Sequence, residues 1–139
     1  MSADFFLDTN ILVYSFDESD LQKQRKSQNL IADALRTGSG AISWQVVQEF
    51  LNVALHKWKS PMTTDDAMSY FSSTLEPLCS VFPSASIWRS ALSLQAQSQY
   101  RMYDSLIVAS ALQSGANILY SEDLQSGRHF DRLEIRNPF

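Results

Sequence analysis

The chain has 139 residues, of which 45% are hydrophobic and 19% are charged, and its net charge is −4. This composition predicts a single globular domain over residues 1–139, long enough to bury a core without disulfides, and it excludes a disordered chain. The acidic balance argues against non-specific nucleic-acid binding through a broadly basic face, but it leaves room for a small local site.

The single cysteine and the N-terminus bear on the compartment. Cys79 has no partner for an intramolecular disulfide, which fits a reducing compartment, and we expect the cytoplasm. The first residues, Met1 to Asp4, lack the basic and apolar regions of a signal peptide. The uninterrupted apolar runs are a few residues long, far short of a membrane span.

The first predicted strand is the apolar run Phe5–Leu7, which Asp8 follows directly. Two interpretations of Asp8 are open. It is the N-cap of a helix through residues 11–13, because Asp suits that position. Alternatively, it lies at the carboxyl edge of a parallel sheet, where open α/β folds place their sites. Taken alone, this stretch favours the cap.

Helices and strands alternate in the next part of the chain. A helix ending at Arg36 follows an acidic turn, and a short strand is predicted at residues 41–43. The helix predicted at 44–58 carries apolar residues at helical spacing. Glu49 lies beside this apolar stripe, on the side that it shares with Gln45. An isolated glutamate in that position is by default a solvated surface residue.

Two further helices are predicted on either side of a strand at residues 78–82. The first begins at Thr63 or Thr64 and the second at Ser84, since both residue types suit an N-cap. The side chains expected to pack inward are Met68, Tyr70, Phe71 and Leu75 in the first helix, and Ile87, Trp88, Ala91 and Leu92 in the second.

The last predicted helix carries Asp104 in its first turn and is apolar nearly all round, which indicates a buried helix. The plain interpretation of Asp104 is a cap or first-turn acid. Ser121-Glu122-Asp123 directly follows a strand predicted at 117–120, and a final strand, at an edge of the sheet, is predicted at 133–136. This alternation predicts an α/β fold, a three-layer α/β/α sandwich with a mainly parallel central sheet.

Acidic residues occupy equivalent places in this predicted fold. Asp8 and Asp123 each follow a strand, and parallel strands bring their carboxyl ends to one edge of the sheet. Asp104 opens the helix before the second of these strands, and Glu49 lies in the helix after the strand at 41–43. Four carboxylates at one edge repel one another unless a cation joins them. Hard divalent cations take oxygen ligands, so Mg²⁺ or Mn²⁺ fits best.

Four blocks of the sequence carry a family resemblance: Phe6-Leu7-Asp8-Thr9-Asn10-Ile11-Leu12, Gln48-Glu49-Phe50, Tyr103-Asp104-Ser105-Leu106-Ile107-Val108-Ala109 and Leu119-Tyr120-Ser121-Glu122-Asp123-Leu124-Gln125. They resemble the sequence blocks of PIN domains, and most closely those of VapC-type toxin ribonucleases from bacterial toxin–antitoxin pairs. The blocks span nearly the whole chain in the right order, with an acid at the matching place in each.

This resemblance implies a metal-dependent endoribonuclease that hydrolyses RNA phosphodiester bonds and leaves a 5′-phosphate and a 3′-hydroxyl. The implied catalytic residues are Asp8, Glu49, Asp104 and Asp123, of which Asp8, Asp104 and Asp123 bind Mg²⁺ or Mn²⁺ and Glu49 acts as a further ligand or orients a water. Asn10 and Ser121 match positions that support the acidic cluster in relatives.

The resemblance also implies protein partners. A nuclease of this kind damages its own cell if uncontrolled, so we expect a small antitoxin that places an Arg or Lys among the four acids. We expect an amphipathic helix of the antitoxin to contact apolar surface nearby. Relatives often form dimers, and we expect a homodimer. The apolar side chains available for that contact are Trp58, Met62 and Phe71, although the core is the commoner place for such residues.

Two alternatives to an RNA-cutting enzyme remain open. The first is a non-catalytic nucleic-acid or protein-binding module whose acids hold a structural ion. The net charge of −4 supports this binding-module alternative, because few basic side chains are available to contact RNA. The candidates are Lys57, Lys59, Arg101, Arg128 and Arg132. The second is a nuclease that acts on single-stranded DNA. Zinc, serine-hydrolase and Walker-type chemistry fit poorly, because the spacings that each requires are missing.

Overall fold

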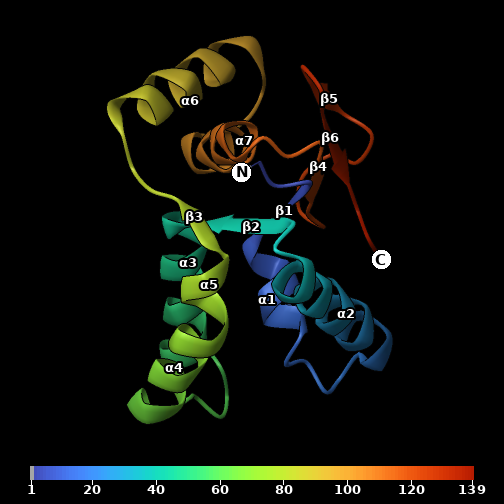
Figure 1. The fold of residues 1–139 in the computed structure, drawn as a ribbon, viewed down its shortest axis with the longest axis vertical. Coiled ribbons are helices and arrows are strands. Elements are labelled where there is room, and N and C mark those ends of the chain that lie inside the picture. Colours follow the sequence, from blue (N-terminus) through green and yellow to red (C-terminus); the bar gives the residue numbers. More distant parts are fainter. Residues whose placement is uncertain (1) are drawn as a thin grey trace.

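A computed structural model describes residues 2–139 and shows one six-stranded sheet (Figure 1). The strands lie in the order β3-β2-β1-β4-β6-β5, and every neighbouring pair is parallel except the antiparallel pair of β5 and β6. Their bounds are Phe5–Leu7 (β1), Gly40–Ser43 (β2), Cys79–Val81 (β3), Ile118–Tyr120 (β4), His129–Phe130 (β5) and Leu133–Arg136 (β6).

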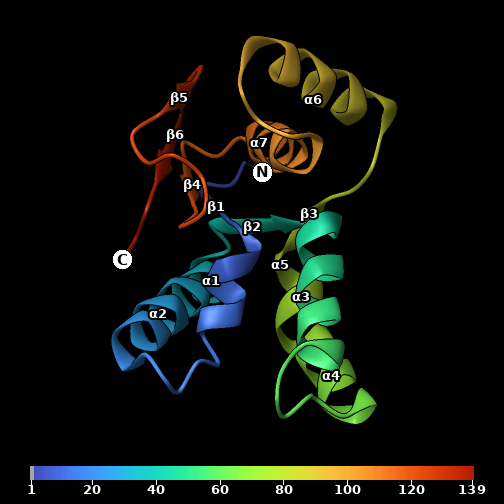
Figure 2. The same cartoon turned by 180° about the vertical axis from the view of Figure 1, so that it is seen from behind.

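Helices cover both faces of this sheet, which confirms the predicted three-layer α/β/α sandwich. In Figures 1 and 2, the last two helices lie on one side of the sheet and the others lie on the opposite side. The helices are α1 (Thr9–Tyr14), α2 (Leu21–Thr37), α3 (Trp44–His56), α4 (Thr64–Tyr70), the π-helical turn η1 (Phe71–Leu75), α5 (Glu76–Leu78), α6 (Ala85–Gln97) and α7 (Met102–Ser114). Within residues 2–139, none of these helices is long and apolar enough to cross a membrane.

The sheet register brings the middle of the core together. Phe6 of β1 lies opposite Ala41 of β2 and Leu119 of β4, and all three side chains are buried. Gly38 ends α2 in the left-handed conformation, with φ of 68°, which turns the chain directly into β2. Gly40 then lets α2 pack closely, because a Cβ at this position would collide with the Ala34 side chain of α2 and would lie 2.8 Å from the Phe5 ring of β1.

Several sequence predictions were wrong in detail. The strand expected at 78–82 is the shorter β3, and α3 ends two residues before the predicted 58. The edge strand β5 was not predicted, because it has only two residues and pairs with β6 alone. Consequently β6 is an inner strand of the sheet rather than an edge strand.

Three side chains predicted to pack inward are exposed instead. Met68 is 64% exposed, because the buried face of this segment runs through Ala67, Thr74 and Leu75 and Met68 lies beside it. In α6 the buried face uses other positions at helical spacing, so Trp88 and Leu92 lie beside it and are 43% and 57% exposed. Trp88 packs its ring edge-to-face against Trp44.

Candidate functional site

Asp8 is both a helix cap and a residue at the carboxyl edge of the sheet. Its Oδ1 accepts a hydrogen bond from the Thr9 N–H at 2.7 Å, and its Oδ2 accepts one from the Ser121 hydroxyl at 2.8 Å. Burial raises the pKa of Asp8 to about 6, the two hydrogen bonds oppose this shift, and the charges of Glu49 and Asp123 add to it. The structure therefore places a buried carboxylate close to two other acids.

Asn10 and Ser121 join the ends of β1 and β4. The Asn10 side-chain N–H donates to Asp123 Oδ2 at 3.2 Å, and its side-chain oxygen accepts from the Glu122 N–H at 3.3 Å. The Ser121 hydroxyl is buried, donates to Asp8 and accepts from the Leu124 N–H at 3.3 Å. These contacts fix the loop that carries Asp123 beside the start of α1.

Glu49 projects from α3 toward the same edge and is half-buried rather than fully solvated. Its Oε2 accepts from the Thr9 hydroxyl at 2.8 Å, and its Oε1 accepts from Gln45 Nε2 at 2.9 Å. Neither Thr9 nor Gln45 was assigned a role from the sequence. A signal was present for Gln45, because it lies four residues before Glu49 on the same side of one helix.

Asp104 lies in the first turn of α7 and is half-buried. Burial raises the pKa of Asp104, the charges of Asp123 and Glu49 raise it further, and Arg101 lowers it. The adjacent backbone is tied to α3, because Gln45 Nε2 also donates to the Tyr103 carbonyl at 3.1 Å. The N-terminus of α7 is thus held against the helix that carries Glu49.

Together these four acids form an acidic edge, defined here as Asp8, Glu49, Asp104 and Asp123. Among the described residues, the salt bridges join Lys23 to Glu122, Arg36 to Asp33 and Arg136 to Glu134, so none of the four has a basic partner. A cleft of about 490 Å³ opens beside Glu49 and Asp123, with Asn52 and Lys57 also in its wall.

A divalent cation fits this donor set, because carboxylate oxygens are the ligands that hard cations take and, among the described residues, no salt bridge neutralises the four acids. The carboxylates are turned toward their hydrogen-bond partners, and within residues 2–139 no three His, Cys, Asp or Glu side chains form a group arranged to hold a metal ion. The chemistry of the edge and its electrostatics support a cation site, although the described residues do not form a ready-made set of metal ligands.

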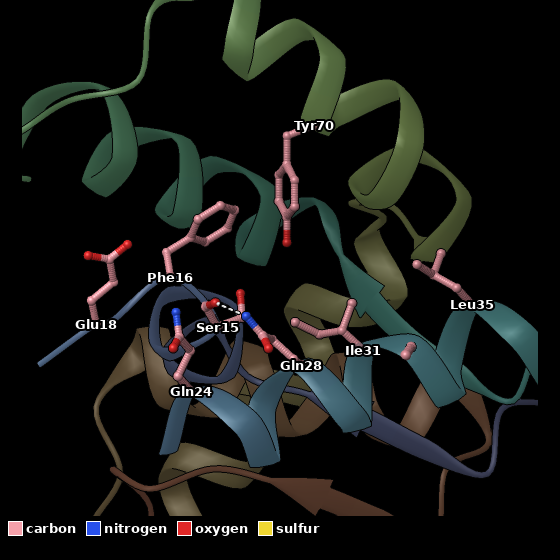
Figure 3. A pocket seen from close by; sticks show the side chains of 9 residues that line it. Ser15, Phe16, Glu18, Gln24, Gln28, Ile31, Leu35 and Tyr70 are labelled. Atoms are coloured by element: carbon pink, nitrogen blue, oxygen red, sulfur yellow. Dashed lines mark hydrogen bonds between the residues drawn. The ribbon is translucent and has the colours of Figure 1, made fainter. Parts of the chain in front are cut away.

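Two other hollows lie away from the acidic edge. One of about 1150 Å³ lies between the end of α1 and the α3–α4 connection, and a second of about 370 Å³ lies beside it. In the smaller hollow, the Tyr70 side chain points toward α2, and the Phe16 ring packs edge-to-face against the Tyr70 ring (Figure 3). Gln28 of α2 donates to the Ser15 carbonyl at 3.0 Å. None of the four acids lines either hollow, so neither is the better candidate for hydrolytic chemistry.

Comparison with known families identifies the class of protein. The family described as "PIN domain" matches residues 5–134, which is nearly the whole chain. The chain therefore belongs to the PIN domain family, as the four sequence blocks predicted. PIN domains are nucleases and generally use divalent metal ions. A comparison with curated protein sequences gave no match.

Solved structures share this fold at low sequence identity. A chain of a toxin–antitoxin complex from Klebsiella pneumoniae is 19% identical with a TM-score of 0.70, and the match covers 99% of this chain and 98% of that one. A chain of VapBC2 from Rickettsia felis, bound to a promoter DNA fragment, is 20% identical with a TM-score of 0.68 and coverages of 96% and 97%. VapC20 from Mycobacterium tuberculosis, a toxin that cleaves the sarcin–ricin loop, is 16% identical with a TM-score of 0.58 and coverages of 86% and 90%.

Proposed function

We propose that the chain is a metal-dependent endoribonuclease and the toxin of a toxin–antitoxin pair. The observation that carries this proposal is the acidic edge, in which acids from separate elements converge and, within residues 2–139, none forms a salt bridge. A helix cap has no need for several such carboxylates at one place, and a binding module would need them only to hold a structural ion. A nuclease has such a need, because a cation held there can act on a phosphodiester bond.

In this proposal Asp8, Asp104 and Asp123 hold Mg²⁺ or Mn²⁺, and Glu49 completes the cluster. A bound divalent ion supplies a lowered pKa for the attacking water and stabilises charge on the phosphate. The chain's own contribution is to orient these acids. Ser121, at 2.8 Å, and the Thr9 N–H orient the carboxylate of Asp8. Asn10 orients Asp123 through a hydrogen bond of 3.2 Å. Thr9 and Gln45 hold the two carboxylate oxygens of Glu49, at 2.8 and 2.9 Å.

Cleavage of labelled RNA tests the proposal. The purified protein should cut a single-stranded oligoribonucleotide in Mg²⁺ or Mn²⁺ and should stop in EDTA, while a single-stranded DNA of the same sequence should stay intact. Asp8→Asn should abolish cutting, and Asp65→Asn, which changes an exposed acid at the start of α4, should not. RNA cleavage by Asp8→Asn at the wild-type rate would reject the site, and cutting of DNA alone would change the substrate class.

An antitoxin partner is supported by the fold neighbours, several of which were solved as toxin–antitoxin complexes. The hollow in Figure 3 offers apolar contacts from Phe16, Ile31 and Leu35 that suit an amphipathic helix of such a partner. Co-expression of the neighbouring gene should relieve growth inhibition and give a complex that co-purifies. Neither effect would be seen if the chain works without an antitoxin.

We also propose a homodimer. The side chains first considered for this contact, Trp58, Met62 and Phe71, are partly buried and pack against the core. Exposed apolar side chains elsewhere, such as Met68 and Leu92, are therefore better placed for an interface. Light scattering on the purified chain should give the mass of a dimer, and a monomer at micromolar concentration would remove this proposal.

A further inference from the structure

Arg128 packs its guanidinium against two aromatic rings near the acidic edge. Its central carbon lies 5.0 Å from the centroid of the Tyr100 ring and 4.9 Å from that of Phe130. The two rings also contact each other, with centroids 5.6 Å apart. Contacts of this kind hold a guanidinium in one orientation and leave its charge unneutralised.

The backbone around Arg128 is fixed to the central sheet. Its carbonyl accepts from the Ile135 N–H at 2.9 Å, and the Gly127 N–H donates to the Ile135 carbonyl at 2.8 Å. Ile135 pairs in turn with Leu119 of β4, the strand that leads to Asp123. Figures 1 and 2 both show β5, which follows Arg128, beside the turn that joins α6 to α7 and contains Tyr100.

The charge of Arg128 is available to a ligand. Within residues 2–139, Arg128 takes part in no salt bridge, and its side chain donates no hydrogen bond to another residue. Burial raises the pKa of the Tyr100 hydroxyl, while Arg128 lowers it and Asp104 raises it. Because both charges act on one hydroxyl, the guanidinium lies on the side of the molecule that carries Asp104.

We propose that Arg128 is a positioning residue that binds a phosphate of the RNA strand next to the phosphate that is cut. This inference rests on the proposed ribonuclease function. Four carboxylates repel an approaching polyanion, and a cation among them neutralises charge only where the bond breaks. An arginine held by two rings can bind the neighbouring phosphate through its planar donors, with little loss of side-chain entropy.

The salt dependence of RNA binding tests this role directly. Binding of a fluorescent single-stranded oligoribonucleotide is measured by anisotropy over a range of KCl concentrations, in an Asp8→Asn background that does not cut. Arg128→Ala should weaken binding about tenfold or more, the loss expected for one charge-assisted contact. It should also reduce the slope of log K against log salt by about 0.7, the value for one phosphate contact on a single strand.

Two matched variants separate phosphate binding from folding. Arg89→Ala removes an exposed arginine from the first half of α6, which was not among the candidate RNA contacts, and should leave the slope unchanged. Arg128→Lys keeps the charge and should retain most of the slope while losing part of the affinity, because lysine lacks the planar donors. Urea unfolding of each variant shows whether the hairpin is intact.

Steady-state cleavage by the otherwise wild-type enzyme gives a second readout. Arg128→Ala should raise KM and leave kcat nearly unchanged, because the contact is made equally with substrate and transition state. Equal affinity, slope and KM for Arg128→Ala and Arg89→Ala would overturn the role of Arg128, as would a wild-type protein that does not bind RNA. A wild-type protein that binds RNA without cutting it would reject the ribonuclease function, and the binding series would still decide the role of Arg128.

Discussion

Replacing Asp8 with Asn should abolish RNA cleavage and make the protein more stable. In the folded protein the Asp8 carboxyl has a pKa of about 6, raised from 3.8 by burial. Ionisation of this carboxyl therefore costs more free energy in the folded protein than in the unfolded chain. Asn keeps the cap, because its side-chain oxygen can accept from the Thr9 N–H as Asp8 Oδ1 does at 2.7 Å. It removes the buried charge.

The size and the pH window of the effect follow from the two pKa values. A rise from 3.8 to about 6 corresponds to roughly 3 kcal/mol at pH 7, and this free energy favours unfolding. The penalty is absent below the unfolded pKa, grows as the pH rises between the two values and is complete above about 6. We expect the free energy of unfolding of Asp8→Asn to exceed that of wild type by about 1–3 kcal/mol at pH 7.5. The gain is smaller than the full penalty because an amide accepts the hydrogen bond from the Ser121 hydroxyl less well than a carboxylate does.

Urea unfolding in EDTA at pH 7.5 and at pH 4 measures this gain, with Asp65→Asn as an exposed control. The midpoint for Asp8→Asn should exceed that of wild type at pH 7.5, and the two should converge at pH 4. Added Mg²⁺ should narrow the difference at pH 7.5, because an ion that binds only the folded wild type stabilises it by mass action. A variant no more stable than wild type at pH 7.5, or equally stabilised at both pH values, would refute the reasoning.

Three further substitutions test the parts that surround the site. Gly40→Ala should lower the free energy of unfolding by about 1–3 kcal/mol in urea, because its Cβ would meet the Phe5 ring at 2.8 Å. Phe50→Ala should lower it by about 3–5 kcal/mol, since this fully buried ring packs among three other aromatic rings. Gln45→Leu should reduce kcat for RNA at least about tenfold with little change in KM, because Glu49 loses the donor at 2.9 Å that orients it.

The general arrangement of the acidic edge could be predicted from the sequence because it depends on chain order. A carboxylate placed after a parallel strand has only one edge of the sheet to occupy, so Asp8 and Asp123 lie together wherever β1 and β4 pair. Asp104 lies in the first turn of α7, the helix before β4, whereas Glu49 lies in the middle of α3, and the place of both in the cluster was implied by the family resemblance. The hydrophobic patterns of the predicted strands were sufficient to place Asp8 and Asp123 at one edge of the sheet.

The contacts that orient the acids could not be predicted in the same way. Gln45 bonds to both Glu49 and the Tyr103 carbonyl, and this depends on how closely α3 and α7 pack. No periodicity in either helix reports that distance. Arg128 was one of several candidate cations in the sequence, and its selection rests on the Phe130 ring two residues away and on the Tyr100 ring from the distant turn between α6 and α7.

The structure also bears on the choice between a cap and a site for Asp8. A cap alone needs only a short side chain with an acceptor, and Ser, Thr or Asn would serve without burying a charge. Asp8 instead has a pKa raised by burial and by two neighbouring acids, and it lowers the stability of the folded protein at neutral pH. Groups that lower the free energy of unfolding in this way cluster at functional sites, where binding of a ligand or substrate stabilises the folded protein again. The carboxylate of Asp8 is therefore better explained by a cation at the acidic edge than by the helix that it caps.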